Sequence, residues 1–220
     1  MTPLEAFFLY VYAFCLGSVP SAYILARVSK GIDLRLVGSG TLGASNVGVQ
    51  IGRMWMVPVV LFDLVAKGMS PVWLGQTLLA SNLDSFSVAI APVLALIGHN
   101  WCLWLKLDGG RGILVVIGSV MVLAPVVCGV LLMSLLCVWI VTRNVPFSVL
   151  VSLMMTPFAA WALNGDLRIL VFTALAVVLV LVKRVSGNRG RSKKYVSRRS
   201  MLVNRILFDR DIANRLDWIN

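Results

Sequence analysis

The chain has 220 residues, of which 59% are hydrophobic and only 13% are charged. A soluble domain is about one quarter charged, and so apolar a chain would expose far too much apolar surface in water. Composition therefore excludes an ordinary soluble domain and predicts an integral membrane protein. The formal net charge is +11, and 11 of the 20 Lys and Arg residues lie from Lys183 onward.

A helix needs about 20 apolar residues to cross the hydrocarbon core of a bilayer. By this criterion we predict spans over 4–28, 54–75, 86–105, 126–142, 147–163 and 167–183. The uncharged stretch from Gly112 to Val141 is too long for one span and too short for two full ones. Pro125 lies near its middle and interrupts a helix, so a short helix over 112–124 precedes the span from 126. The prediction is an all-α membrane protein with seven transmembrane helices.

The basic residues favour seven spans over six. The 29–53 loop, the 106–111 turn, Arg143 and the tail are basic, whereas the 76–85 loop carries only an aspartate. Seven spans place nearly all basic groups on one side, with the N-terminus outside and the C-terminus cytoplasmic, as the positive-inside rule requires. Six spans would put Arg143 and the tail on the opposite side from the 29–53 loop. We expect a multi-pass protein of the cell (plasma) membrane.

The chain divides into a membrane domain, 1–190, and a basic cytoplasmic tail, 191–220. The tail contains an apolar run between Met201 and Phe208, interspersed and flanked with arginines, which predicts an amphipathic helix on the membrane surface. Anionic lipid attracts each such basic residue by about 1 kcal/mol. A nucleic-acid-binding tail and a partner-binding helix are the alternatives, and the adjacent span favours lipid.

The cysteines, Cys15, Cys102, Cys128 and Cys137, lie in or beside apolar runs without metal-ligand spacing. With a single histidine, His99, the sequence gives no His-rich metal centre, and we expect no metal.

The loop after the first span combines glycines with small polar side chains in the run Gly38-Ser39-Gly40-Thr41-Leu42-Gly43-Ala44-Ser45-Asn46. Successive backbone N–H groups in such turns form anion-binding nests. Arg35 and Arg53 flank the loop and could hold a phosphate group by charge-assisted hydrogen bonds. A flexible connector is the alternative.

A second polar segment, Gly98-His99-Asn100-Trp101 followed by Lys106-Leu107-Asp108-Gly109-Gly110-Arg111-Gly112, joins two spans on the same side. Its glycines and basic groups lie next to a helix start, which suits anions. The alternative is a tight turn whose basic groups anchor the protein at the interface.

Together the two loops resemble those of the bacterial acyl-phosphate:glycerol-3-phosphate acyltransferase family, PlsY. The family's first loop typically reads GSGNIGATN or GSGNPGATN, where this chain has GSGTLGASN; its second reads GH…FKGGKG, where this chain has GH…LDGGRG. The other matching segments are Gly17-Ser18-Val19-Pro20 with Tyr23, Asp63 with Lys67-Gly68, and Thr142-Arg143. The resemblance covers about residues 15–190 and implies the family's seven-span fold.

The resemblance implies transfer of a fatty acyl group from acyl phosphate to the sn-1 hydroxyl of glycerol 3-phosphate. The products are lysophosphatidic acid and phosphate, in the first step of phospholipid synthesis. It implies no cofactor. The expected partners are the two substrates and membrane lipid, with the enzyme that makes acyl phosphate as a candidate, and we expect a monomer that binds no nucleic acid. Acyl phosphate is already activated, so the enzyme mainly positions substrates and stabilises charge.

The resemblance also assigns residues. The candidates for catalysis are Ser39, His99 and Arg111. The candidates for binding substrate phosphate are Arg35, Gly38, Gly40, Gly43, Ser45, Asn46, Arg53, Lys67, Lys106, Gly109, Gly110, Arg143, Ser148 and Asn188.

Several of these roles have a structural alternative. The unperturbed pKa of a histidine lies near working pH, so His99 could be a general base, but it could instead fix the shape of a loop, which we favour slightly. Ser39 and Ser45 could be nucleophiles, yet no base is visibly paired with them, so we interpret them as phosphate donors. Asp63 and Lys67, four residues apart, share one helix face, where an intramembrane pair is either functional or a structural ion pair.

The chain departs from the family pattern at several positions. Thr41 replaces the usual asparagine, Asp108 replaces a lysine, and Cys102 replaces a common proline. Arg111 takes the place of the lysine in GGKG, and arginine is not interchangeable with lysine. The family's last motif, approximately Arg-His-x-x-Asn-Ile-x-Arg, is matched at Arg184, Asn188 and Arg191, but Val185 replaces its histidine.

Three functions therefore compete. The first is an active acyltransferase, and the second is a diverged, non-catalytic lipid-binding or regulatory membrane protein of the same fold. The third is a small transporter or channel, but the sequence lacks the internal repeat and the deep polar residues that transporters show.

Overall fold

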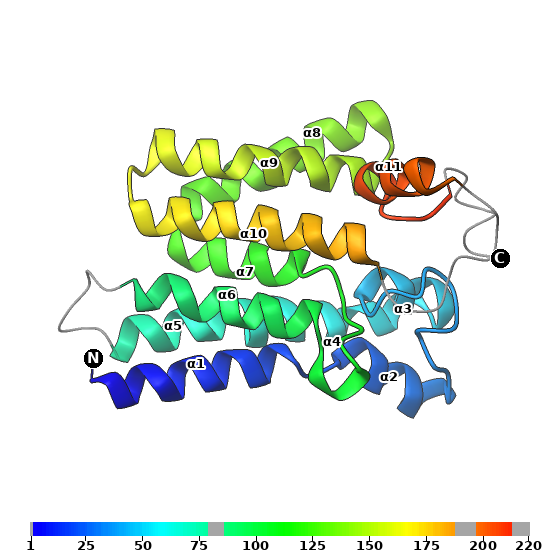
Figure 1. Cartoon of the computed structure of the whole chain (residues 1–220), viewed down its shortest axis with the longest axis horizontal. Coiled ribbons are helices and arrows are strands. Elements are labelled where there is room, and N and C mark those ends of the chain that lie inside the picture. Colours follow the sequence, from blue (N-terminus) through cyan, green and yellow to red (C-terminus); the bar gives the residue numbers. More distant parts are fainter. Residues whose placement is uncertain (1, 79–85, 188–196, 213–220) are drawn as a thin grey trace.

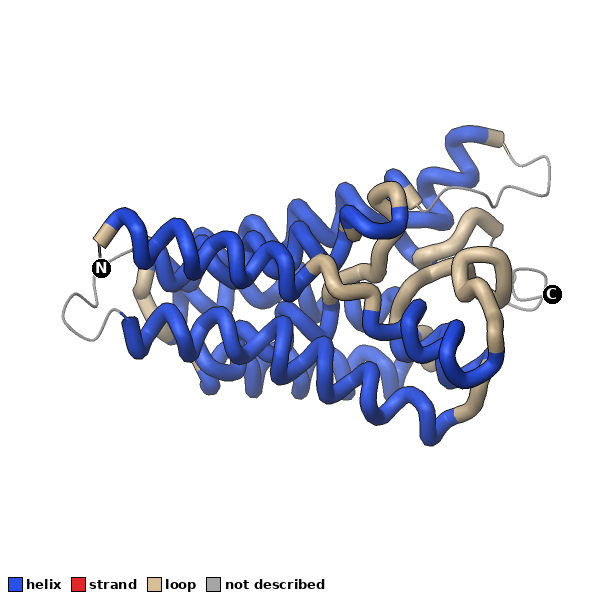
Figure 2. Tube along the Cα trace, turned by 90° about the horizontal axis from the view of Figure 1, so that it is seen from below, coloured by secondary structure: helices blue, strands red, loops and turns tan. Residues whose placement is uncertain are grey.

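The computed structural model describes residues 2–78, 86–187 and 197–212, and every regular element within these ranges is a helix. The long helices lie side by side along one axis, and the longer described loops gather at one end, together with α2 (Ser21–Lys30), α3 (Ala44–Gln50) and α11 (Arg198–Phe208) (Figures 1 and 2). Six helical stretches are long and apolar enough to cross a membrane, namely Pro3–Lys30, Arg53–Leu78, Ser87–Leu105, Pro125–Thr142, Val145–Leu163 and Leu167–Ser186. The chain is thus a multi-pass, all-helical membrane protein.

The first span is not one continuous helix. It consists of α1 (Pro3–Gly17) and α2 (Ser21–Lys30), separated at Ser18–Pro20. Pro20 lacks a backbone N–H and so cannot continue the hydrogen bonding of a helix. Gly17 lies so close to α6 (Ser87–Asn100) that an added Cβ would collide with the Ala95 carbonyl. The sequence analysis predicted this span without its break.

The second span is continuous but changes helix type. A 3-10 turn, Arg53–Trp55, leads into α4 (Met56–Leu61), a π-helical segment, Phe62–Met69, and α5 (Ser70–Leu78). The π-helical segment packs closely on α7 (Ile113–Leu123), since a Cβ at Gly68 would lie 2.9 Å from the Gly118 Cα. Ser119 Oγ donates to the Gly68 carbonyl at 3.0 Å. Such π segments occur frequently at functional sites.

The predicted interruption at Pro125 is confirmed. The short helix α7 ends at Leu123 and α8 (Pro125–Thr142) begins at the proline itself, which is suited to the first turn of a helix. The chain then continues through α9 (Val145–Leu163) and α10 (Leu167–Ser186). The main core lies between α1, α6, α7, α8, α9 and α10 and includes Leu96, Val115, Val116 and Phe172, all buried.

The predicted amphipathic segment of the tail is also helical, as α11 (Arg198–Phe208). It packs against α9 and α10 at the end of the molecule where the loops gather (Figure 1). It also ends in a left-handed residue, Asp209, with φ 54°. The C-terminal part of the chain is therefore brought back onto the helical bundle.

Candidate active site

The loop over residues 34–46 is held in shape by one buried amide. Asn46 Nδ2 donates to the carbonyls of Leu34, Val37 and Thr41 at 3.1–3.2 Å, and Asn46 Oδ1 accepts from Ser39 N at 3.2 Å. Only 3% of Asn46 is exposed. The side chain thus acts as a brace, and the short helix α3 (Ala44–Gln50) carries it.

Glycine is required where this loop turns. Gly38 and Gly40 have φ values of 56° and 68°, in the left-handed region that glycine enters without steric cost. A Cβ at Gly38 would also collide with the Asn46 amide. Beside it, Ser39 Oγ and Thr41 Oγ1 lie 2.8 Å apart, and no base is hydrogen-bonded to Ser39 among its described contacts. The loop therefore presents hydroxyl groups rather than an activated nucleophile.

The glycine turn before α7 packs directly against this loop. Gly110 N donates to the His99 carbonyl at 3.1 Å, and a Cβ at Gly110 would collide with the His99 ring and come within 2.9 Å of the Leu42 carbonyl. The two glycine-rich segments predicted from sequence are therefore neighbours at one end of the molecule. This juxtaposition is the condition on which their joint interpretation depends.

A buried polar cluster lies beneath the two loops. Lys67 Nζ is 2.8 Å from Asp63 Oδ1 and 3.2 Å from His99 Nδ1, and Ser21 Oγ donates to Asp63 Oδ1 at 2.8 Å. Asp63 and Lys67 are almost completely buried. The predicted pair is therefore formed, and the described polar side-chain contacts of His99 are with this pair, at 3.2 Å to Lys67 Nζ and 3.8 Å to Asp63 Oδ1.

Arg111 is held by the C-terminal part of the chain. Its Nη1 donates to the Lys183 carbonyl at 2.7 Å, and its Nε lies 2.7 Å from Asp209 Oδ1. The guanidinium group is therefore fixed by α10 on one side and by the residue after α11 on the other.

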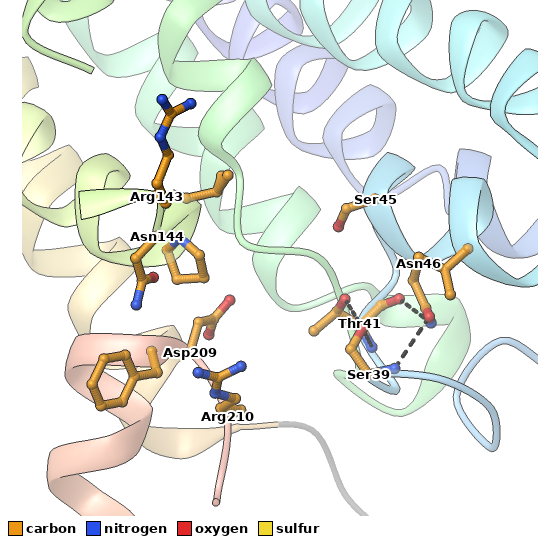
Figure 3. A pocket seen from close by; sticks show the side chains of 12 residues that line it. Ser39, Thr41, Ser45, Asn46, Arg143, Asn144, Asp209 and Arg210 are labelled. Atoms are coloured by element: carbon orange, nitrogen blue, oxygen red, sulfur yellow. Dashed lines mark hydrogen bonds between the residues drawn. The ribbon is translucent and has the colours of Figure 1, made fainter. Parts of the chain in front are cut away.

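A pocket of about 370 Å³ opens beside these groups. Ser39, Thr41 and Asn46 lie on one side of it, and Asp209 and Arg210 lie on the other (Figure 3). Its other lining residues are Ser45, Val49, Arg143, Asn144, Val145, Pro146 and Phe208. Arg143 extends away from Asp209 and Arg210 in Figure 3, and its guanidinium lies 5.6 Å from the centre of the Trp139 ring. Hydroxyls, an amide and arginines around one small cavity suit a phosphate group.

Other predicted basic residues do not line this pocket. Arg53 and Lys106 are exposed. Arg35 pairs with Asp33 at 2.7 Å, and this guanidinium holds the pKa of the Asp33 carboxyl below its usual range. Ser148 is fully buried, and its hydroxyl donates to the Asn144 carbonyl at 2.8 Å. Asn188 and Arg191 lie outside the described residues.

An apolar groove of about 680 Å³ lies beside the polar cluster, lined by Tyr12, Cys15, Leu16, Val19, Pro20, Tyr23, Ile24, Trp104 and Leu105. Val19 and Pro20 also line a small cavity with Lys67, His99 and Gly110. The interruption of the first span therefore brings the end of an apolar groove next to the buried charges.

Several residues that line or support the site were not assigned from the sequence, and four of them are polar or charged side chains outside the glycine-rich loop. Ser21 contacts Asp63, Asn144 lines the pocket, and Asp209 and Arg210 form its C-terminal wall. Ser21 follows the matched Gly-Ser-x-Pro segment and Asn144 follows the matched Thr-Arg turn, so proximity to a motif was the available signal. No signal in the sequence places the last two residues at the pocket.

The sequence model of the family described as glycerol-3-phosphate acyltransferase matches residues 7–193. The chain belongs to this acyltransferase family. A glycerol-3-phosphate acyltransferase of Dehalococcoides mccartyi is 30% identical over 216 residues, covering 96% of this chain and 91% of the relative. One from Pasteurella multocida is 35% identical over 186 residues, covering 84% and 89%.

The fold of the glycerol-3-phosphate acyltransferases is also matched. The crystal structure of PlsY, an integral membrane glycerol 3-phosphate acyltransferase, in its glycerol 3-phosphate form, superposes with a TM-score of 0.75 at 24% identity, covering 81% of this chain and 88% of that one. Its lysophosphatidic acid form gives a TM-score of 0.74 at 23% identity, covering 82% of this chain and 88% of that chain. The family resemblance stated from the loops is thereby confirmed.

Proposed function

We propose that the chain transfers a fatty acyl group from acyl phosphate to the sn-1 hydroxyl of glycerol 3-phosphate. The observation that supports this most directly is the contact between the two glycine-rich segments. It places a polar, arginine-lined pocket and the end of an apolar groove at the same end of the bundle. Two phosphorylated substrates, one of them carrying an acyl chain, need such a combination of surfaces.

The proposed reaction needs no covalent enzyme intermediate. The sn-1 oxygen attacks the acyl carbonyl carbon, the bond from that carbon to the phosphate oxygen breaks, and inorganic phosphate leaves. The proton of the hydroxyl passes to substrate phosphate. Ser39, whose hydroxyl contacts only Thr41 and the loop backbone among its described partners, donates to phosphate in this scheme. Arg111 stabilises the negative charge that develops.

Lys67 and His99 have a supporting part in this proposal. Lys67 is 1% exposed and bonded to both Asp63 and His99. In this proposal it does not touch the substrate but holds the polar cluster together and keeps the positions of Asp63 and His99 fixed. The His99 ring packs against Gly110 and so keeps the second turn against the first loop. The remaining basic residues, Arg35, Arg53 and Lys106, attract the anionic substrates toward this end.

We also propose seven spans, with the N-terminus outside and the site at the cytoplasmic face of the cell membrane. The start of α1 and the helix α11 lie at opposite ends of the molecule (Figure 1), as an odd number of crossings requires. The short helix α7 provides the seventh crossing, and basic residues gather at the end with the site. We propose a monomer, which receives its donor from the enzyme that makes acyl phosphate.

The direct test uses the purified protein in lipidic mesophase with palmitoyl phosphate and glycerol 3-phosphate. We expect inorganic phosphate to appear only when both substrates are present, and palmitoyl coenzyme A to be inactive as donor. No release above background, in lipid that supports an established family enzyme, would reject this function in favour of the non-catalytic alternative.

Two variants test the residue assignments. Ser39→Ala and Arg111→Ala should each lower the rate of phosphate release by about tenfold or more, since each removes a hydrogen bond to a charged group. Arg168→Ala is the matched control, because Arg168 pairs with Asp166 at 2.7 Å in the turn at the opposite end of the bundle. Wild-type turnover in either test variant would discard its assignment.

A further inference from the structure

The C-terminal segment 197–212 is tied to the bundle by arginine side chains. Arg184, at the end of α10, donates from Nη1 to the Ile206 carbonyl at 2.8 Å and from Nη2 to the Pro146 carbonyl at 2.9 Å. Arg184 is 2% exposed. One buried guanidinium therefore joins the last turn of α11 to the first turn of α9, whose residues line the pocket.

Two further contacts fix the residues after α11. Arg205 donates to the Val185 carbonyl at 2.7 Å and pairs with Asp211. Asp209 pairs with Arg111 at 2.7 Å. Asp209 and Asp211, the neighbours of Arg210 in sequence, are both paired with arginines, so the backbone of Arg210 is fixed at the wall of the pocket.

Arg210 carries positive charge to the side of the pocket opposite Ser39 and Thr41 (Figure 3). Its guanidinium lies 5.3 Å from the centre of the Phe208 ring, and Phe208 lines the same pocket. Stacking of this kind orients a guanidinium. Asp209 pairs with Arg111, and Arg143, which also lines the pocket, extends away from Arg210 (Figure 3).

We propose that Arg210 binds the phosphate group of a substrate, so that the tail supplies one wall of the active site. The match to the family's sequence model ends at residue 193, so Arg210 lies beyond the segment that this model describes. The identification of the ligand as a substrate rests on the proposed function. The existence of an anion site between Arg210 and the Ser39 loop does not depend on that function.

The test compares Arg210→Ala with Arg199→Ala, which removes the same charge from an exposed position on α11. Binding of glycerol 3-phosphate and of inorganic phosphate is measured by calorimetry, and the KM for each substrate by phosphate release. Arg210→Ala should weaken phosphate binding by about tenfold to hundredfold, the value of a charge-assisted hydrogen bond, and Arg199→Ala should leave it unchanged. Arg210→Lys should recover part of the loss, and the melting temperature of each variant shows whether it is folded.

The substrate whose KM rises identifies the phosphate that Arg210 contacts. If the wild-type protein binds phosphate but releases none from acyl phosphate, the proposed function fails, while the binding comparison still decides the role of Arg210. Three results would overturn the inference. Arg210→Ala could fold and still bind phosphate like the wild type, or the wild type could bind no phosphate. Alternatively, Arg210→Ala and Arg199→Ala could lose phosphate binding equally, and only when the protein is in anionic lipid. The last would assign the arginines of α11 to the membrane surface.

Discussion

Asn46 offers the sharpest test of how the first loop keeps its shape. Asn46→Ala removes four hydrogen-bond contacts, three from Nδ2 and one accepted by Oδ1. The three carbonyls share the two hydrogens of the amide nitrogen, so the contacts amount to about three bonds of about 1 kcal/mol net each, and the variant should lose about 3 kcal/mol of stability. For a chain of this size 1 kcal/mol corresponds to about 2–4 °C, and the melting temperature should fall by about 10 °C.

Asn46→Asp separates the donors of this side chain from its shape. A carboxylate fits the same volume but turns an oxygen toward the carbonyls of Leu34, Val37 and Thr41, which now receive no N–H. We expect this variant to be at least as unstable as the alanine variant. Asn144→Ala is the control for stability, since its side chain accepts a single bond, from Phe147 N at 3.2 Å, and capping bonds contribute about 1 kcal/mol.

Thermal unfolding in detergent, followed by circular dichroism, measures all three variants. Phosphate release should be lost together with the loop in both Asn46 variants. If Asn46→Asp melts with the wild type, the amide does not hold the loop, and the reasoning from these four contacts is wrong.

Two further predictions concern the second turn and the buried cluster. Gly110→Ala places a Cβ against the His99 ring and should slow phosphate release by about tenfold to hundredfold, because small displacements in a site are costly; Gly129→Ala, whose Cβ meets nothing within 4 Å, should keep the wild-type rate. Lys67→Met leaves Asp63 buried without its counter-ion and should cost about 3–5 kcal/mol in thermal unfolding, most of which Asp63→Asn in the same chain should restore. A wild-type rate for the first variant, or no rescue in the double variant, would contradict these contacts.

The helical layout could be predicted because a membrane span depends on the average hydropathy of about 20 consecutive residues. Apolar run length located the spans to within a few residues, and Pro125 correctly divided the central run. The break at Ser18–Pro20 and the π-helical segment Phe62–Met69 could not be found in this way. Both depend on how closely neighbouring helices approach, through Gly17 and Gly68, and hydropathy does not record such contacts.

The site was predictable only where motifs mark it. The segments around Ser39 and Gly110 were recognisable because together they resemble two motifs of one family, and the structure brings them into contact. The tail was predictable as a helix but not as a wall of the pocket. Its docking depends on Arg184 and Arg205 finding backbone carbonyls, and an arginine that binds a carbonyl has the same sequence pattern as one that faces water or lipid.

The shortness of α7 has a consequence for the depth of the proposed site in the bilayer. Its 11 residues rise about 16 Å, roughly half the 30 Å of hydrocarbon, and in Figure 1 α7 stops short of α9 and α10 at the end with the loops. With α7 as the proposed seventh crossing, the glycine turn before it lies below the level of the lipid headgroups, where irregular backbone is tolerated only when it is packed or lines a cavity. In the proposed reaction, a water-soluble acceptor then moves down to the acyl donor, and the reactive end of the donor stays within the bilayer.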